Sequence, residues 1–242
     1  MKKYQQRHYR NLLKNHRLNF FRVVVKETDL AIYAQKTLET VARELILKYR
    51  GYIESYIETY PEFAATLLPW PLLEPAPEIV RNMVWAGHQA GVGPMAAVAG
   101  AVAEHVGQGL LKYSPEVIVE NGGDVFLKIQ GSATVAIFAG KSPLSLRIGI
   151  RIQPENKAFS VCTSSGTVGH SKSMGKADAV CVVSQSCCLA DAMATSLGNQ
   201  VSGKKDIQKA IEIGKQAQGV EGILVIVGKK IGAWGNLQII GL

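Results

Sequence analysis

The order of apolar segments along the chain constrains its fold most strongly. Strand-like stretches of alternating or continuous apolar residues are interrupted twice by longer segments with helical periodicity. The strand-like stretches cover 20–34, 116–129, 133–140, 144–152, 159–165, 177–184 and 222–242, and the helical ones cover 36–60, 78–91, 94–111, 187–199 and 204–218. This order predicts an α+β fold of two similar ββ-αα-ββ units in tandem, with antiparallel sheets and with helices on one face.

The helical segment at 36–60 shows how the buried face of a helix is predicted. Its apolar residues fall near one stripe and its charged residues lie on the other side. The predicted stripe consists of Leu38, Val41, Ala42, Leu45 and Leu47. We expect this stripe to face the core.

Positive charge is concentrated at the N-terminus. The chain has 242 residues and a formal net charge of +8, and residues 1–26 contain eight Lys or Arg residues and no acid. The other 19 basic residues balance the 19 acidic ones. We therefore predict a basic arm at 1–18 and a single α+β domain at 19–242. We expect the arm to be solvated or to contact another subunit of a homo-oligomer, because no nucleic-acid motif adjoins it.

Cysteine usage and the N-terminal sequence indicate a cytoplasmic protein. The four cysteines form neither a C-x-x-C pair nor a Cys/His metal spacing, so no disulfide framework or zinc site is expected. The basic N-terminus lacks the apolar core and the cleavage site of a secretory signal. The longest charge-free stretch, 82–102, contains His88, several glycines and Pro94, which favour buried helices over a membrane span.

Two glycine-rich stretches suit ligand binding. Residues 91–97 (GVGPMAA) place Gly93 at the start of a helix, where free backbone N–H groups favour a phosphate; the alternative is a tight turn into a closely packed helix. Residues 121–124 (NGGD) predict a β-hairpin turn, because glycines supply positive φ angles. The same glycines would also let a flat ligand approach the backbone, with Asp124 accepting a hydrogen bond.

The stretch 162–171 (CTSSGTVGHS) predicts a polar loop rich in hydroxyl groups. It lacks the G-x-S-x-G pattern of a serine hydrolase. Its two interpretations are a solvated surface loop and a ligand-binding loop. Because a histidine side chain titrates near neutral pH, His170 is a candidate general acid or base. The alternative is a histidine that is only solvated.

An acidic residue stands in the apolar helix predicted at 187–199. Asp191 and Thr195 share one helical face, and no basic residue lies within one turn of the acid. A carboxylate and a hydroxyl on one face suit a hard cation such as Mg²⁺. The alternative is structural: Asp191 would lie in the first turn, where the helix dipole favours it, and Thr195 would bond back to a carbonyl.

Taken together, four stretches resemble the ApbE-like superfamily, which includes the thiamine-biosynthesis lipoprotein and flavin transferase enzymes. These stretches are VGPMAAVAG, VENGGD, TSSGTVGHS and LADAMATSLGN. The chain looks closest to a cytoplasmic branch named only for its likeness to ApbE. The resemblance implies a T-fold-like architecture, binding of FAD and Mg²⁺, and either cleavage of the FAD pyrophosphate or transfer of FMN to a protein threonine.

The resemblance also implies roles for individual residues. Asp191 and Thr195 match the family's metal pair, and Ala96 matches the alanine whose carbonyl is a third ligand. His170 falls near the catalytic histidine. The implied cofactor-binding residues are Gly93, Asn121, Gly122, Gly123, Asp124, Ser164, Ser165 and Gly166.

The chain departs from the family pattern at three points. Ala97 stands where the transferases carry a lysine, SKSMGK at 171–176 replaces Asp-Pro-Arg-Thr-Gly, and a lipobox cysteine is missing. These departures favour a Mg²⁺-dependent enzyme that cleaves a phosphoanhydride of FAD or a related phosphate-bearing nucleotide over a flavin transferase. The alternative is a module that binds a flavin or pterin-like ligand without turnover. The predicted partner is a small nucleotide or flavin ligand; a membrane and nucleic acid are not expected.

Overall fold

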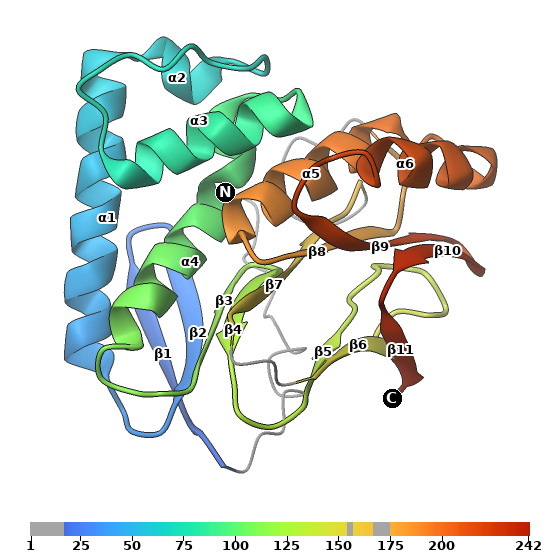
Figure 1. Cartoon of the computed structure of the whole chain (residues 1–242), viewed down its shortest axis with the longest axis horizontal. Helices are drawn as coiled ribbons and strands as arrows, with labels where there is room; N and C mark the ends of the chain where they lie inside the picture. The colour runs from blue at the N-terminus through green and yellow to red at the C-terminus, as the bar shows by residue number, and fades with distance from the viewer. Residues whose placement is uncertain (1–16, 154–156, 167–174) are drawn as a thin grey trace.

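Eight strands form one antiparallel sheet, and the two halves of the chain meet in its middle (Figure 1). The structure is a computed structural model that describes residues 17–153, 157–166 and 175–242. The strands in spatial order are β1 (Asn19–Val25), β2 (Thr28–Ala34), β3 (Val117–Asn121), β4 (Asp124–Lys128), β7 (Phe159–Ser164), β8 (Ala179–Ser184), β9 (Val220–Val227) and β10 (Lys230–Gly235). The pairing of β4 with β7 joins the halves.

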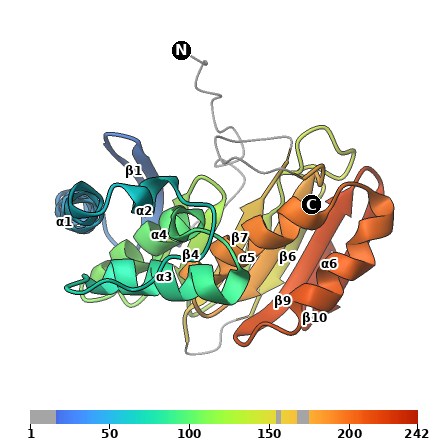
Figure 2. The same ribbon diagram turned by 90° about the horizontal axis from the view of Figure 1, so that it is seen from above.

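The helices of both halves lie along one face of this sheet (Figure 2). In the first half they are α1 (Glu39–Thr59), α2 (Glu62–Ala65), α3 (Glu78–Ala90), the 3₁₀ turn η2 (Pro94–Ala97) and α4 (Val98–Leu110). In the second half they are α5 (Cys187–Gln200), the 3₁₀ turn η3 (Lys204–Asp206) and α6 (Ile207–Gly214). Each half is therefore a strand pair, a helical segment and a second strand pair, which confirms the predicted α+β order.

A second, three-stranded sheet covers the other face of the large sheet. It consists of β5 (Ala133–Ala136), β6 (Ile148–Ile152) and β11 (Gln238–Gly241). Ile137 and Ile150 are fully buried in a separate core between the two sheets. The predicted sheet with helices on one face is thus correct for that face, and a small sheet forms a third layer.

The first described residues, Arg17 and Leu18, pack on the domain. Leu18 is buried in the core between the sheets, and the Arg17 guanidinium pairs with the buried Glu116 carboxylate. The last two residues of the predicted arm therefore pack on the domain. Residues 1–16 of the arm lie outside the described part of the chain.

Glycines let α4 lie close to its neighbours. A Cβ at Gly107 would lie 2.2 Å from the ring of Phe126 on β4, and a Cβ at Gly100 would lie 2.4 Å from the carbonyl oxygen of Cys187 on α5. Both distances are too short for a real side chain, so only glycine permits these approaches. As a result, the first turns of α4 and α5 are in direct contact.

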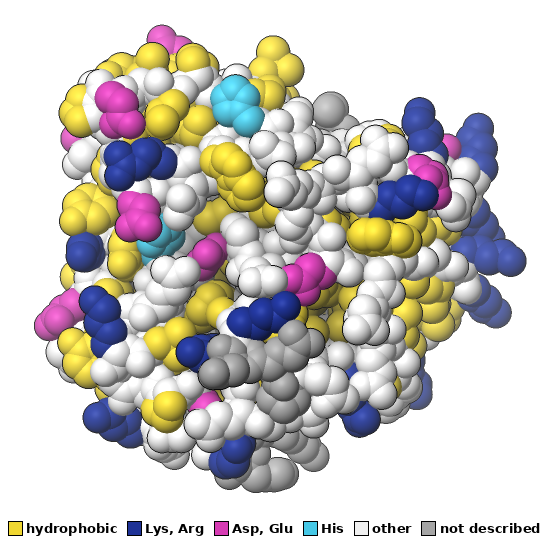
Figure 3. Space-filling view, in the orientation of Figure 1, with side chains coloured by type: hydrophobic (Ala, Val, Ile, Leu, Met, Phe, Trp, Pro, Cys, Tyr) yellow, Lys and Arg dark blue, Asp and Glu magenta, His cyan; other side chains and the backbone are white. Residues whose placement is uncertain are grey.

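Exposed apolar side chains are frequent on the first half of the molecule, as the space-filling view shows (Figure 3). They include Leu47, Leu67, Leu68, Leu72 and Trp85. No helix in the described part of the chain is long and apolar enough to cross a membrane. The four cysteines are free thiols and all are buried.

Candidate functional site

Asp191 is held by the N-terminus of a helix from the other half of the chain. Its Oδ2 accepts a hydrogen bond from the backbone N–H of Gly100 at 2.9 Å, and Gly100 is the third residue of α4. The first amides of a helix lack partners within the helix, so a carboxylate there is stabilised. Burial nevertheless raises the pKa of Asp191 to about 7, and its hydrogen bonds to Gly100 and Ala99 oppose that rise.

The structural alternative proposed for Asp191 needs correction. The first turn of α5 contains no acid, because Asp191 is the fifth residue of that helix. The dipole that favours its carboxylate is therefore that of α4. Thr195 is partly exposed, and within the described residues no intramolecular hydrogen bond engages its hydroxyl, so the bond back to a carbonyl is not formed.

Glu104 makes the reciprocal contact, and sequence reasoning missed it. From α4, its Oε2 accepts hydrogen bonds from the backbone N–H groups of Cys187 at 2.7 Å and Cys188 at 3.2 Å, at the start of α5. Its Oε1 accepts from Gln108 at 3.2 Å. Burial raises the pKa of Glu104. The signal was present in the sequence, because Glu104, like Asp191, is a lone acid among small apolar residues of a helix.

These contacts form a ladder between two helices that run in opposite directions. Glu104 on α4 accepts a hydrogen bond from Cys187 on α5. One turn towards the N-terminus of α4 and one turn towards the C-terminus of α5, Gly100 donates to Asp191. Residues four apart on a helix recur on the same face about 6 Å further along the axis. The 3₁₀ turn η2, which contains Ala96, packs against α5, which contains Thr195. The elements that carry the three residues expected to hold a metal are therefore in contact.

The turn between β3 and β4 is tied to the same helix start. Gly122 and Gly123 have φ angles of 72° and 124°, so the predicted glycine hairpin is confirmed. The Asn121 side-chain amide donates to the carbonyl of Ala99 at 3.1 Å, and the Gly123 N–H donates to Glu120 at 3.2 Å. The turn therefore lies against the first turn of α4, beside Asp191.

A second carboxylate faces Asp191. Asp124 is buried, and burial followed by the negative charge of Asp191 raises its pKa well above the ordinary value. Hydrogen bonds from the Cys162 thiol and from the backbone N–H of Thr163 lower the pKa and only partly offset this. Within the described residues neither aspartate forms an ion pair. Two like charges in a buried position are unfavourable unless a cation or a proton compensates them.

The end of β7 supplies an unpartnered hydroxyl. Ser164 is buried, and its Oγ has no hydrogen-bond partner among the described residues. Ser165 and Gly166 follow it and are half-buried. The Gly166 N–H donates to Ala177 O at 3.0 Å, and a Cβ there would lie 2.0 Å from the Gly175 carbonyl oxygen, so Gly166 is required by the close approach of two chain segments.

Gly93 has a similar structural role. Its N–H donates to the Leu67 carbonyl at 2.9 Å, and a Cβ would lie 2.0 Å from the Thr66 carbonyl oxygen. Because the Gly100 N–H is also engaged, by Asp191, two of the amides near this helix start are used within the chain. The tight-turn interpretation of residues 91–97 therefore explains Gly93.

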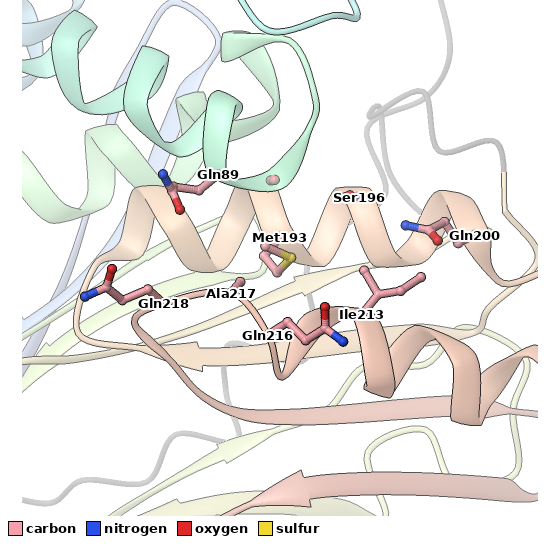
Figure 4. Close-up of a pocket in the computed structure, with 9 residues that line it drawn as sticks. Gln89, Met193, Ser196, Gln200, Ile213, Gln216, Ala217 and Gln218 are labelled. Carbon is pink, nitrogen blue, oxygen red and sulfur yellow. The ribbon is translucent and has the colours of Figure 1, made fainter.

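A groove lies on the opposite side of α5. It has a volume of about 350 Å³ and is bounded by α3, α5 and the end of α6 (Figure 4). Its lining residues are Gln89, Ala90, Met193, Ser196, Gln200, Ile213, Gln216, Ala217 and Gln218. None of them is charged, and none of the predicted site residues is among them. The groove and the Asp191 face are separated by α5.

Comparison with known proteins identifies the family. A sequence model of the family described as AbpE bacteria matches residues 10–233, which is most of the chain. The chain belongs to the AbpE bacteria family. Its ApbE-like resemblance, predicted from four motifs, is thereby confirmed.

Relatives of this AbpE bacteria chain occur in archaea. A UPF0280 protein of Methanococcus aeolicus is 42% identical over 202 residues, which cover 81% of this chain and 82% of the relative. A UPF0280 protein of Methanosarcina acetivorans is 42% identical over 216 residues, covering 88% and 85%.

Solved structures share the fold of this family member. The apo flavinyl transferase ApbE of Pseudomonas stutzeri superimposes with a TM-score of 0.60 at 14% identity, over 90% of this chain and 93% of that chain. The flavin transferase ApbE of Vibrio cholerae gives 0.60 at 12% identity, over 90% and 96%. At these identities the likeness establishes the architecture.

Two further expectations for the AbpE bacteria chain concern the catalytic residue and the metal ligands. His170, the expected catalytic residue, lies outside the described residues. Within the described residues, no three His, Cys, Asp or Glu side chains gather in a way that could hold a metal ion. The expected ligand set contains only one such side chain, Asp191, beside a threonine hydroxyl and a backbone carbonyl.

Proposed function

We propose that this chain holds Mg²⁺ at Asp191, Thr195 and the Ala96 carbonyl and acts on FAD or a related phosphate-bearing nucleotide or cofactor. The observation that carries the proposal is the pair of buried carboxylates, Asp124 and Asp191, for which the described residues supply no cation. With a proton on Asp124, whose pKa is raised well above its ordinary value, a divalent ion would compensate the negative charge of Asp191.

The residues present fit such an ion. A carboxylate, a hydroxyl and a carbonyl are the oxygen donors that hard divalent cations take, and waters or phosphate oxygens would complete the shell. Among the described residues, neither the Thr195 hydroxyl nor the Ser164 Oγ forms an intramolecular hydrogen bond, so both are available to a ligand.

Bound Mg²⁺ would polarise a phosphoryl oxygen of the ligand. The chain's own residues would do the rest. The Gly122–Gly123 turn offers a backbone without side chains to a flat ring. Asp124, whose pKa is raised, can hold a proton and donate a hydrogen bond, and Ser164 can donate another. The ladder between α4 and α5 fixes Asp191 in place.

Cleavage of a phosphoanhydride is favoured over flavin transfer. Ala97 stands at the position of the lysine in the transferases, and SKSMGK replaces their Asp-Pro-Arg-Thr-Gly. The same departures support the second candidate, a cytoplasmic module that binds a flavin or pterin-like ligand without turnover.

Incubation of the purified chain with FAD and Mg²⁺ separates these candidates. The proposed enzyme releases FMN and AMP, and the products disappear with EDTA or in Asp191→Asn. Binding without products supports the module. A thermal shift also tests the ligand class: FAD at 100 times its Kd should stabilise the fold by about 2.7 kcal/mol. No shift with FAD, FMN or ADP would rule out a flavin nucleotide.

A further inference from the structure

We infer that Glu104, which lies one helical turn beyond Gly100 on α4, is a positioning residue for the Asp191 site. It would act without touching the ligand, by fixing the register of α5 against α4. The part of the inference that concerns cation binding rests on the proposed function. The part that concerns the register of the two helices does not, and hydrogen exchange at the Gly100 amide tests it separately.

Both carboxylate oxygens of Glu104 accept hydrogen bonds. Both backbone N–H groups at the start of α5, from Cys187 and Cys188, converge on Oε2, and Gln108 donates to Oε1. The Glu104 side chain is 9% exposed, so water cannot readily replace it. Charge-assisted bonds to the first amides of a helix are strong and fix that helix end.

The fixed end determines where Asp191 falls. Cys187 and Asp191 are one turn apart on α5, as Glu104 and Gly100 are on α4, so anchoring one pair sets the other. The contact leaves little slack, because a Cβ at Gly100 would lie 2.9 Å from the Asp191 Cβ. A shift of α5 along its axis would separate Asp191 from the Gly100 amide and would move Thr195, one turn further along α5, by the same distance.

The experiment compares substitutions at Glu104 in the full-length chain. Glu104→Gln keeps a carbonyl oxygen for the two amides, and Gln108 can turn its own amide to suit the new side chain. Glu104→Leu keeps similar bulk and leaves the amides without an acceptor. Ile150→Ala, in the core between the sheets, is the control for general destabilisation. Glu104→Asp replaces the leucine variant if that variant does not fold.

Two measurements are made on each variant. Titration with Mn²⁺, followed by electron paramagnetic resonance, should show at least tenfold weaker binding in Glu104→Leu, with Glu104→Gln and Ile150→Ala within threefold of wild type. Hydrogen exchange at the Gly100 amide should accelerate at least tenfold in Glu104→Leu relative to Ile150→Ala.

The outcomes distinguish the positioning role of Glu104 from the proposed cation site. Unchanged Gly100 exchange in Glu104→Leu, or wild-type Mn²⁺ affinity in that variant, overturns the positioning role. Accelerated exchange in a chain whose wild type binds no Mn²⁺ supports the register role and overturns the proposed cation site. Equal losses in Ile150→Ala would mean that general destabilisation explains the effect, which also overturns the inference.

Discussion

The carboxylate of Asp191 on α5 accepts a hydrogen bond from the backbone N–H of Gly100 on α4 at 2.9 Å. This contact joins the helices of the two ββ-αα-ββ halves at Asp191, one of the expected metal ligands. The hydrogen bond from Gly100 therefore explains in part why an acidic residue, Asp191, stands in an apolar helix. Within the described residues no cation pairs with the Asp191 carboxylate, which lies beside the buried Asp124, and this is the reason to propose a bound metal ion.

The absence of space at Gly100 gives a first prediction. Gly100→Ala should destabilise the fold by about 1–3 kcal/mol, because the added Cβ would meet the Cys187 carbonyl oxygen at 2.4 Å. It should also weaken Mg²⁺ binding by displacing Asp191. Gly51→Ala is the matched control in α1, where a Cβ meets nothing within 4 Å and should stabilise by about 0.5–1 kcal/mol. Chemical denaturation checks both; equal effects would contradict the close packing.

The raised pKa of Asp191 gives a second prediction. Its value is about 7 in the fold against 3.8 ordinarily, so between these values the folded state binds more protons than the unfolded state. The free energy of unfolding without divalent cations should therefore fall as pH rises from about 4 to about 7. This component should vanish in Asp191→Asn and persist in Thr195→Ala. Urea unfolding at several pH values measures it, and an identical slope in Asp191→Asn and wild type would contradict it.

The Ser164 hydroxyl provides a third test. Since its Oγ has no hydrogen-bond partner in the described part of the chain, Ser164→Ala should leave the stability unchanged or slightly higher. If Ser164 bonds a ligand, the same variant should bind FAD several-fold more weakly. Ser114→Ala is the contrasting variant, because Ser114 accepts and donates hydrogen bonds and its loss should destabilise the fold. Wild-type FAD affinity in Ser164→Ala would remove Ser164 from the site.

The N-terminal arm provides a fourth test. A deletion should end at residue 16, because Leu18 is buried and Arg17 pairs with Glu116. We predict that removal of 1–16 changes the oligomeric state and leaves ligand binding intact. Analytical sedimentation of the full chain and of the chain without residues 1–16 measures whether the oligomeric state changes. If instead only salt-dependent DNA or RNA binding is lost, the arm is a nucleic-acid segment.

Much of the fold follows from local patterns. The predicted helices at 36–60, 78–91 and 94–111 correspond to α1, α3 and η2 with α4, and the Asn-Gly-Gly turn forms where its glycines permit positive φ. Periodicity was less accurate for single residues. Leu47, predicted in the buried stripe of α1, is 53% exposed, whereas Ile46 is fully buried.

Tertiary contacts explain what local patterns missed. The use of Gly93 and Gly166 depends on segments distant along the chain, and so does the third layer formed by β5, β6 and β11. The partner of Asp191 lies 91 residues away. The sequence alone shows only that Asp191 is a lone acid in an apolar helix. The same pattern around Glu104 would have marked Glu104 as a candidate site residue.

Calorimetric titration of FAD into wild type, Asp191→Asn and Thr195→Ala, with and without Mg²⁺, tests the proposed cation site most directly. We predict that Asp191→Asn folds but binds FAD at least tenfold more weakly in Mg²⁺, a loss of about 1.4 kcal/mol or more, with a smaller loss in Thr195→Ala. Without Mg²⁺ the three proteins should differ little. If Asp191 serves only to cap α4, Asp191→Asn should lose stability and keep its affinity, and wild-type affinity in that variant would contradict the metal site.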